Sequence, residues 1–390
     1  MRGDDDEQLT THQNEIILTG AQVVTDSEIF SGTCVIRNGK IAEVDQGPSQ
    51  LAQAIDLEGD YLIPGLIDIH TDNLEKHLEP RPGVHWPVLA ALQVHDRMMA
   101  TAGITTVFDS LCVGQDNHVK QGRRDALVQA LEAVSIAQDD ALLKSDHLFH
   151  LRCEVSSPDV LDQLDVHVEN PLVRMISLMD HTPGQRQWSN LDAWFRYHSR
   201  THSREELTAQ MDFLLSEQEK HAAPNRAAVL ERAKAHGIPL ASHDDTTVEH
   251  VMEAAADGIH ISEFPTTLEA ARAAHENGMV TVMGGPNVVK GGSHSGNVSA
   301  HDVAKAGLLD GLSSDYVPIS MLHAAFILFE RHGIDLVTAV GMVTSGPADM
   351  AELPDRGRIK QGLRADLVWV KHYHHMPAIR GVWLAGQQVA

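Results

Sequence analysis

The chain has 390 residues, of which 43% are hydrophobic, and its formal net charge at pH 7 is -24. This length suits one large domain, or one large domain with a small satellite. The acidic excess argues against non-specific binding to nucleic acid or to anionic membranes, since both need a basic surface. No stretch approaches the roughly 20 uninterrupted apolar residues that a membrane helix needs. An anionic ligand would therefore need a local basic pocket or a metal.

The N-terminus and the cysteines predict a cytoplasmic protein. Residues 1–7 are acidic and lack the basic start and apolar middle of a secretory signal. Cys34, Cys112 and Cys153 form no C-x-x-C pair and are odd in number, which argues against a disulfide framework or a zinc ribbon. We expect them to be small buried side chains. The composition does not determine the oligomeric state, and a homo-oligomer is one of the possibilities.

Both ends of the chain have the pattern of short strands joined by turns. Asn38-Gly39 lies between two strand-like runs and is a strong hairpin signal. The last residues repeat this pattern, and chain termini commonly lie close in space. We therefore expect residues 1–63 and 357–390 to form one small β-sandwich domain together.

Residues 64–356 alternate strand-like runs with helical ones. The predicted strands are 66–69, 105–109, 148–154, 173–181, 238–243, 258–262, 280–283 and 308–315. Predicted helices include 88–102, 124–138, 204–236 and 267–277. Eight strands in strict alternation with helices predict an α/β fold of the (β/α)₈ TIM-barrel type.

The first of these strands ends in an unusual polar pattern. Pro64-Gly65 precedes the apolar run, and His70-Thr71-Asp72 follows it. Because side chains alternate along a strand, His70 and Asp72 would leave it on the same face, where they could share a divalent cation. An isolated H-x-D pattern is more often a buried hydrogen-bonded pair, so the other strand ends decide between the two.

Active sites of such barrels lie at the C-terminal ends of the strands. The metal ligands predicted at these ends are His70, Asp72, Glu154, His181, His243 and Asp315, with Asp109, Asp180, Asp244 and Asp245 as alternates. Mixed nitrogen and oxygen donors suit Zn²⁺, Mn²⁺ or Fe²⁺ better than Mg²⁺ or Ca²⁺ alone. Six ligands exceed the needs of one tetrahedral ion. We therefore predict two divalent ions bridged by Glu154 and a nucleophilic hydroxide, with Asp315 as general base and His243 as a second catalytic residue.

Each of three assignments has an alternative. Glu154 could form a salt bridge at the barrel bottom, and His181 could bind substrate instead of metal. Asp315 could cap the helix that starts near Pro318.

A glycine-rich stretch predicts a phosphate site. Residues 287–297 hold one lysine, three glycines, two serines and a histidine, which together offer backbone N–H groups, hydroxyls and a cation. A lone loop of this kind is more often a plain turn, but basic residues near the strand ends make a positive pocket plausible in an acidic protein. The predicted substrate ligands are Lys76, Arg81, Arg186, Asn287, Lys290, Ser293, His294, Ser295 and Asn297. Trp188, Tyr197, Phe264 and Tyr316 are candidate stacking residues, although core packing is the commoner role of aromatic side chains.

At this point the chain resembles the amidohydrolase superfamily. The resemblance rests on residues 64–70 (PGLIDIH), on the late Asp315, and on residues 362–368 (GLRADLV). The sequence departs from the usual superfamily pattern by having H-x-D in place of H-x-H and Glu154 in place of the bridging lysine. Residues 70–84, 180–187, 242–247 and 285–297 resemble the ribosyl-triphosphate diphosphatases of the carbon–phosphorus lyase pathway, and this likeness covers nearly the whole chain.

The resemblance implies a reaction and a substrate. The substrate would be a small anionic sugar triphosphate, alpha-D-ribose 1-methylphosphonate 5-triphosphate, cleaved to its 5-phosphate and pyrophosphate. One alternative is a metal-dependent amidohydrolase or deaminase acting on a cyclic amide or a nucleobase, and the cationic stretch from Lys290 to Asn297 counts against it. A third hypothesis is a non-catalytic barrel that has lost its metal. The presence of all six candidate ligands in the sequence argues against it.

Overall fold

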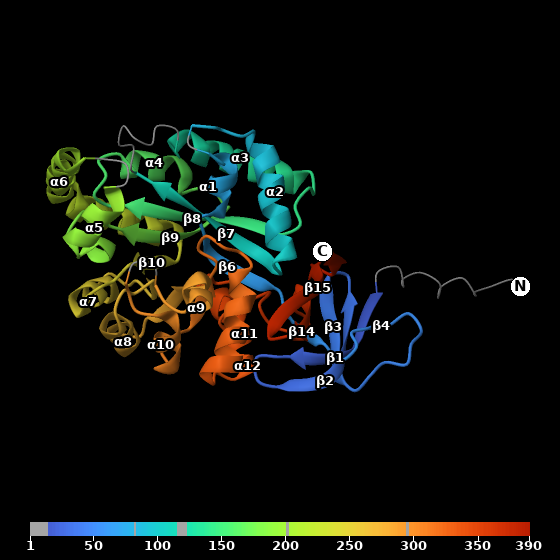
Figure 1. The fold of residues 1–390 in the computed structure, drawn as a ribbon. Coiled ribbons are helices and arrows are strands. Elements are labelled where there is room, and N and C mark those ends of the chain that lie inside the picture. Colours follow the sequence, from blue (N-terminus) through green and yellow to red (C-terminus); the bar gives the residue numbers. More distant parts are fainter. Residues whose placement is uncertain (1–14, 82, 115–122, 200–202, 294–295) are drawn as a thin grey trace, which may run out of the picture.

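The computed structural model describes residues 15–81, 83–114, 123–199, 203–293 and 296–390. The acidic residues 1–7 and the predicted substrate ligands His294 and Ser295 lie outside these ranges. The structure consists of an eight-stranded parallel barrel and a second sheet that both ends of the chain build beside it (Figure 1). Among the described residues, no helix combines the length and the apolar character that crossing a bilayer requires.

Eight neighbouring parallel strands form the barrel, and all eight predicted runs contribute one strand each. In order they are β6 (Leu66–Thr71), β7 (Ile104–Val113), β8 (Asp146–Glu154), β9 (Val173–Met179), β10 (Leu240–His243), β11 (Ile261–Glu263), β12 (Val280–Gly284) and β13 (Gly311–Ser313). The first and last strands meet where Thr71 pairs with Asp315, and the amide of Asp315 donates to the carbonyl of His70 at 3.0 Å. The barrel prediction is confirmed, and its closure brings the His70 segment next to Asp315.

Helices follow the strands and cover the outside of the barrel (Figure 1). They are α1 (Asn73–Leu78), α2 (Val88–Thr101), α3 (Arg123–Asp139), α4 (Val160–His167), η1 (Arg186–Trp188), α5 (Leu191–His198), α6 (Arg204–His236), α7 (Val248–Ala256), α8 (Leu268–Glu276), α9 (Gly285–Lys290), α10 (Ala300–Lys305), α11 (Ser320–His332), α12 (Leu336–Gly341) and α13 (Ser345–Met350). The four predicted helices correspond to α2, α3, α6 and α8. Helix α6 starts at a capping box between Ser203 and Glu206 and ends at Gly237, whose φ of 62° suits glycine.

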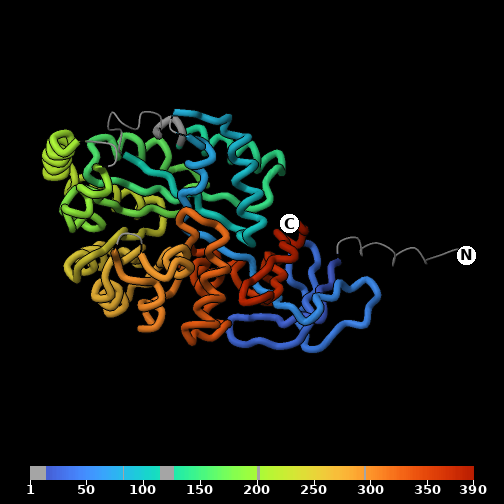
Figure 2. The backbone as a smooth tube through the Cα atoms, viewed as in Figure 1, coloured from blue at the N-terminus to red at the C-terminus, as the bar shows by residue number. Residues whose placement is uncertain are grey.

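The second sheet joins strands from both ends of the chain, as Figure 2 shows by their blue and red colours. Its strands are β1 (Glu15–Val24), β2 (Ile29–Arg37), β3 (Lys40–Gln46), β4 (Ile55–Asp56), β5 (Tyr61–Pro64), β14 (Leu367–Tyr373), β15 (Met376–Leu384) and β16 (Gln387–Gln388). The predicted joining of the two ends is confirmed: β14 pairs antiparallel with β5. Hydrogen bonds connect all eight strands into one sheet, which has its own buried core.

The start of the barrel depends on one glycine. Gly65 separates β5 from β6, and a Cβ atom at this position would lie 2.2 Å from Oγ1 of Thr105 on the next barrel strand. No larger side chain fits there without moving β7 away from β6. Inside the barrel, apolar side chains from six strands pack together with α13 and hold the strand ends in place, among them Ile69, Phe108 and Met175.

A buried ionic cluster lies between β7, β8 and α2. The Asp109 carboxylate contacts His95 Nε2 at 2.6 Å and His147 Nδ1 at 2.8 Å, and His147 Nε2 lies 3.4 Å from Asp96. All four side chains are fully buried. Asp109, an alternate ligand in the sequence prediction, therefore pairs with these histidines and does not line the cavity described below.

This cluster predicts a stability change above neutral pH. Burial opposes the charge on His147, but Asp109 and Asp96 raise its pKa to about 9. A folded-state pKa above the unfolded value adds stability that is complete below about pH 6.5 and is lost as the pH rises through 9. We expect the free energy of unfolding to fall by on the order of 3 kcal/mol over this range.

Denaturant melts at pH 6.5 and pH 9 would measure the change. His147→Gln should flatten the pH dependence, whereas the control His260→Gln, at an exposed histidine, should keep it. Equal pH dependence in wild type and His147→Gln would contradict the assignment.

Candidate active site

A cavity of about 480 Å³ opens at the C-terminal ends of the barrel strands. Five of the six predicted metal ligands line it, together with the alternate Asp244. These residues are His70, Asp72, His181, His243, Asp244 and Asp315. The closure of the barrel thus brings together side chains that are up to 245 positions apart in the sequence.

The potential ligand atoms form two groups of three. In the first, Oδ2 of Asp244 lies 3.8 Å from Nε2 of His181 and 3.4 Å from Nε2 of His243. In the second, Nε2 of His70 lies 3.6 Å from Oδ1 of Asp72, and Asp315 offers an oxygen within 4.8 Å of both. Asp244 was only an alternate in the sequence prediction.

The spacing within these groups fits a metal ion. Oδ2 of Asp244 is buried and has no hydrogen-bond partner, although two imidazole nitrogens face it at 3.4 and 3.8 Å. Leaving a buried carboxylate oxygen unsatisfied is costly. Ligands about 2 Å from a tetrahedral zinc ion lie roughly 3.3 Å from one another, which is close to the separations found here. The donor set therefore suits a divalent cation in each group.

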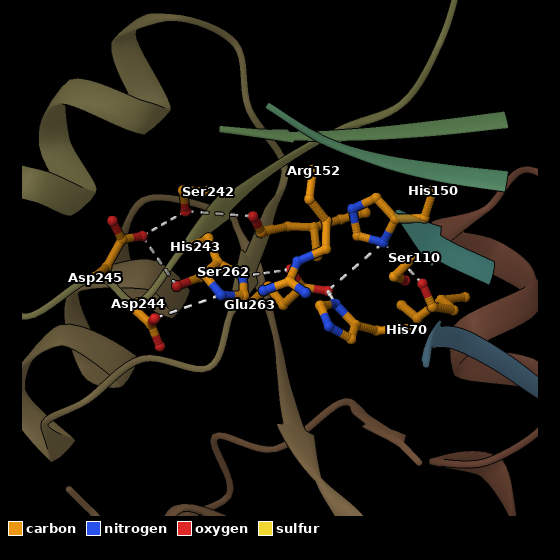
Figure 3. A network of polar contacts seen from close by, with 12 residues as sticks. His70, Ser110, His150, Arg152, Ser242, His243, Asp244, Asp245, Ser262 and Glu263 are labelled. Atoms are coloured by element: carbon orange, nitrogen blue, oxygen red, sulfur yellow. Dashed lines mark hydrogen bonds and ion pairs between the residues drawn. The ribbon is translucent and has the colours of Figure 1, made fainter. Parts of the chain in front are cut away.

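One carboxylate, Glu263, orients an imidazole of each group (Figure 3). Its two oxygens accept hydrogen bonds from Nδ1 of His70 and Nδ1 of His243, each at 2.7 Å. Both rings therefore direct Nε2 into the cavity, and they stack with centroids 5.7 Å apart. A carboxylate that fixes the tautomer of a ligating histidine is a common feature of metal centres.

The charge of Glu263 is maintained by its neighbours. Burial disfavours the carboxylate, but the fields of His70 and His150 and hydrogen bonds from His243 and His70 lower its pKa well below the usual value. Conversely, burial disfavours charge on His70, and Glu263 with Asp72 raises the pKa of that imidazole to about 10. The sequence prediction missed Glu263 because it ended this strand at Ser262. The run Ile261-Ser262-Glu263 was the available signal.

Glu154 contacts the first ligand group through His181 and is a member of neither group. Its carboxylate accepts from Nδ1 of His181 at 2.8 Å and from the amide of His181 at 3.0 Å, and Ser156 donates to it at 2.8 Å. Nε2 of His181 consequently faces Asp244. In this arrangement Glu154 orients His181, whereas the sequence prediction made it a ligand that bridges two ions.

Arg152 was also missed by the sequence prediction. This arginine comes from the inside of β8, and its Nη1 donates to Oδ1 of Asp72 at 2.6 Å. The pair fixes the carboxylate of Asp72 next to His70. Burial opposes ionisation of Asp72, but Arg152 and His70 lower its pKa, so the side chain stays a carboxylate and can bind a cation.

Three residues that follow barrel strands adopt left-handed backbone conformations. Asp244, Phe264 and Asp315 have φ values of 57°, 56° and 55°. Such values are uncommon for residues other than glycine and cluster at functional sites. Here they turn the chain sharply at the barrel mouth, and two of the three residues offer carboxylates to the ligand groups. Phe264 packs edge-on against His70 with ring centroids 4.9 Å apart.

The predicted substrate ligands divide into two sets. Those that line the cavity are Lys76, Asn287, Lys290, Ser293 and Asn297. Two arginines lie elsewhere: Arg81 is exposed and does not line the cavity, and Arg186 is buried and forms an ion pair with Asp245. Arg186 also donates to the carbonyl of His243 at 3.3 Å, which supports the loop after β10. Charge alone could not distinguish these two roles.

Comparisons with known proteins agree with this architecture. Residues 61–389 match the Amidohydrolase family. Alpha-D-ribose 1-methylphosphonate 5-triphosphate diphosphatase of Escherichia coli (strain K12) is 42% identical over 383 residues, which cover 96% of this chain and 100% of the relative. Adenine deaminase of Desulfatibacillum aliphaticivorans is 24% identical over 361 residues, which cover 91% of this chain and 55% of the deaminase.

Solved structures show the same fold at low identity. The crystal structure of N-isopropylammelide isopropylaminohydrolase from Burkholderia multivorans ATCC 17616 has a TM-score of 0.66 and 15% identity, and the match covers 96% of this chain and 98% of that one. This likeness concerns the barrel and the additional sheet and carries no information about substrate.

Proposed function

The chain belongs to the amidohydrolase family, and from that premise we propose that it hydrolyses alpha-D-ribose 1-methylphosphonate 5-triphosphate to the 5-phosphate and pyrophosphate. The full-length relative at 42% identity supports this assignment. The observation that carries it here is the joint position of Lys76 and Lys290 with both ligand groups in one cavity. In a protein with a net charge of -24, these local cations are what a polyphosphate requires.

We further propose that the cavity holds two divalent ions, zinc or else manganese or iron. His181, His243 and Asp244 would bind one ion, and His70, Asp72 and Asp315 would bind the other. When bound, such ions activate water and neutralise charge on phosphoryl oxygens. The proposed ligand is a small sugar triphosphate. The proposed location of the protein is the cytoplasm.

The residues of the chain divide the remaining work. Lys76 and Lys290 would hold the departing pyrophosphate, because both residues line the cavity. Asp315 would accept the proton of the attacking water at its carboxylate. Glu263 keeps Nε2 of His70 and of His243 directed at the cavity, and Glu154 does the same for His181.

Phosphorus NMR in ¹⁸O-labelled water would test the reaction. The metal-reconstituted protein is incubated with a 5-triphosphorylated ribose, and we expect unlabelled pyrophosphate together with ¹⁸O in the ribose 5-phosphate. Removal of metal by a chelator should stop the reaction. Release of orthophosphate would contradict attack at the sugar-proximal phosphorus. Absence of turnover with metal bound would instead favour hydrolysis of a cyclic amide or a nucleobase.

A further inference from the structure

A second cavity of about 460 Å³ adjoins the first. The two share a boundary formed by Asp72, Arg152, His181 and Gln187. Two of these four residues, Asp72 and His181, belong to the two ligand groups described above. Anything bound across the boundary would therefore extend from one cavity through the candidate metal centre into the other.

The two cavities differ in the balance of charge in their linings. In the first cavity the basic residues Lys76, Lys290 and Arg152 balance three carboxylates, which come from Asp72, Asp244 and Asp315. The second cavity has four carboxylates in its lining, from Asp72, Glu75, Glu154 and Glu217, beside the shared Arg152. The two terminal phosphates would therefore be held more favourably in the first cavity, where two lysines face them, than in the second.

The second cavity also has an aromatic wall. In a chain with only 4% aromatic residues, Trp188, Trp194, Tyr197 and Phe213 all line it. They come from η1, α5 and α6, and the rings of Trp188 and Tyr197 contact each other with centroids 5.3 Å apart. Trp194 is 2% exposed and anchors the wall, whereas Tyr197 is 60% exposed and Phe213 52%.

We infer that the second cavity binds the ribose ring of the substrate while the first holds the two terminal phosphates. This inference rests on the proposed function. The apolar C–H faces of a ribose ring can pack on Trp188 and Tyr197, and its hydroxyls can hydrogen bond to carboxylates, which is the usual chemistry of ligand pockets. The phosphorus next to the sugar then lies at the boundary, beside Asp72 and His181. This placement accounts for cleavage that releases pyrophosphate and not orthophosphate.

Isothermal titration of the metal-reconstituted protein with two separate probes, ribose 5-phosphate and pyrophosphate, would test the assignment. Trp188→Ala and Tyr197→Ala should each lower the affinity for ribose 5-phosphate about tenfold and leave the affinity for pyrophosphate unchanged. Lys290→Met should lower the affinity for pyrophosphate and leave the affinity for ribose 5-phosphate unchanged. Tyr373→Ala serves as the matched control, because Tyr373 is 57% exposed on β14 and lines neither cavity.

The outcomes separate this inference from the proposed function. If wild type releases pyrophosphate from a ribosyl triphosphate but the aromatic variants keep full affinity for ribose 5-phosphate, the cavity assignment is overturned and the function stands. An equal loss of affinity for both probes in the aromatic variants would also overturn the cavity assignment and leave the function standing. Failure of wild type to release pyrophosphate would overturn both. The exposed Tyr197 keeps the test informative if Trp188→Ala does not fold.

Discussion

His243→Ala is expected to reduce turnover by roughly 10²–10³-fold or more, as removal of a centrally placed electrostatic group does in other enzymes. His243 contacts three parts of the site: Asp244 of its own ligand group, the orienting carboxylate of Glu263, and the ring of His70 in the second group. Its Nε2 faces Asp244 at 3.4 Å, its Nδ1 donates to Glu263 at 2.7 Å, and its ring stacks on His70. The substitution removes a proposed ligand of the first group. It also removes contacts with Glu263 and His70 that help to orient the second group.

Metal content and turnover should be measured together. We expect His243→Ala to hold less metal per chain than wild type, and its fold to be weakened by about 1–3 kcal/mol because a buried oxygen of Glu263 loses its donor. His260→Ala, which truncates an exposed histidine, is the matched control and should behave as wild type. Full metal content and full turnover in His243→Ala would exclude the proposed ligand set.

Glu263→Gln is expected to lower metal affinity by roughly 10–100-fold, although Glu263 is not itself a member of the proposed ligand set. The carboxylate accepts from Nδ1 of both His70 and His243. An amide offers one oxygen and one NH₂ group. The imidazole facing the NH₂ would have to move its proton to Nε2, and that nitrogen could no longer bind a cation.

Competition titration with a chelating dye would measure the affinity, and denaturant melts would report the loss of the charged hydrogen bonds, which we expect to cost about 2 kcal/mol. Glu269→Gln tests the same chemical change at an exposed position of α8. If Glu263→Gln binds metal as tightly as wild type, Glu263 does not hold the two Nε2 atoms in place, and its proposed orienting role is wrong.

Local patterns in the sequence were sufficient to locate the barrel strands and several helices. The run that ends in His70-Thr71-Asp72 shows this well, because a buried strand with a period of two places both side chains on one face. Polar residues at the ends of the other strands followed from the same rule. Hydrophobic periodicity is a property of neighbouring residues, so it can be recognised without knowledge of the fold.

The roles of particular polar residues depended on contacts that no local pattern contains. Glu263 meets His70 across 193 positions, and its strand extends one residue beyond the predicted end. Arg186 is paired with Asp245, although by charge alone it resembled Lys290. Glu154 faces His181, although by position it resembled a bridging ligand.

What the sequence by itself determined about this protein is therefore the barrel, the joining of both termini in one sheet, and most of the strand ends that border the candidate active site. Only the tertiary structure decided which of those side chains face the cavity and which orient a neighbour. It also placed Lys76 and Lys290 in one cavity and the aromatic wall in the other. The physical reason is that periodicity fixes the face of a strand, whereas closure of the barrel fixes which faces meet.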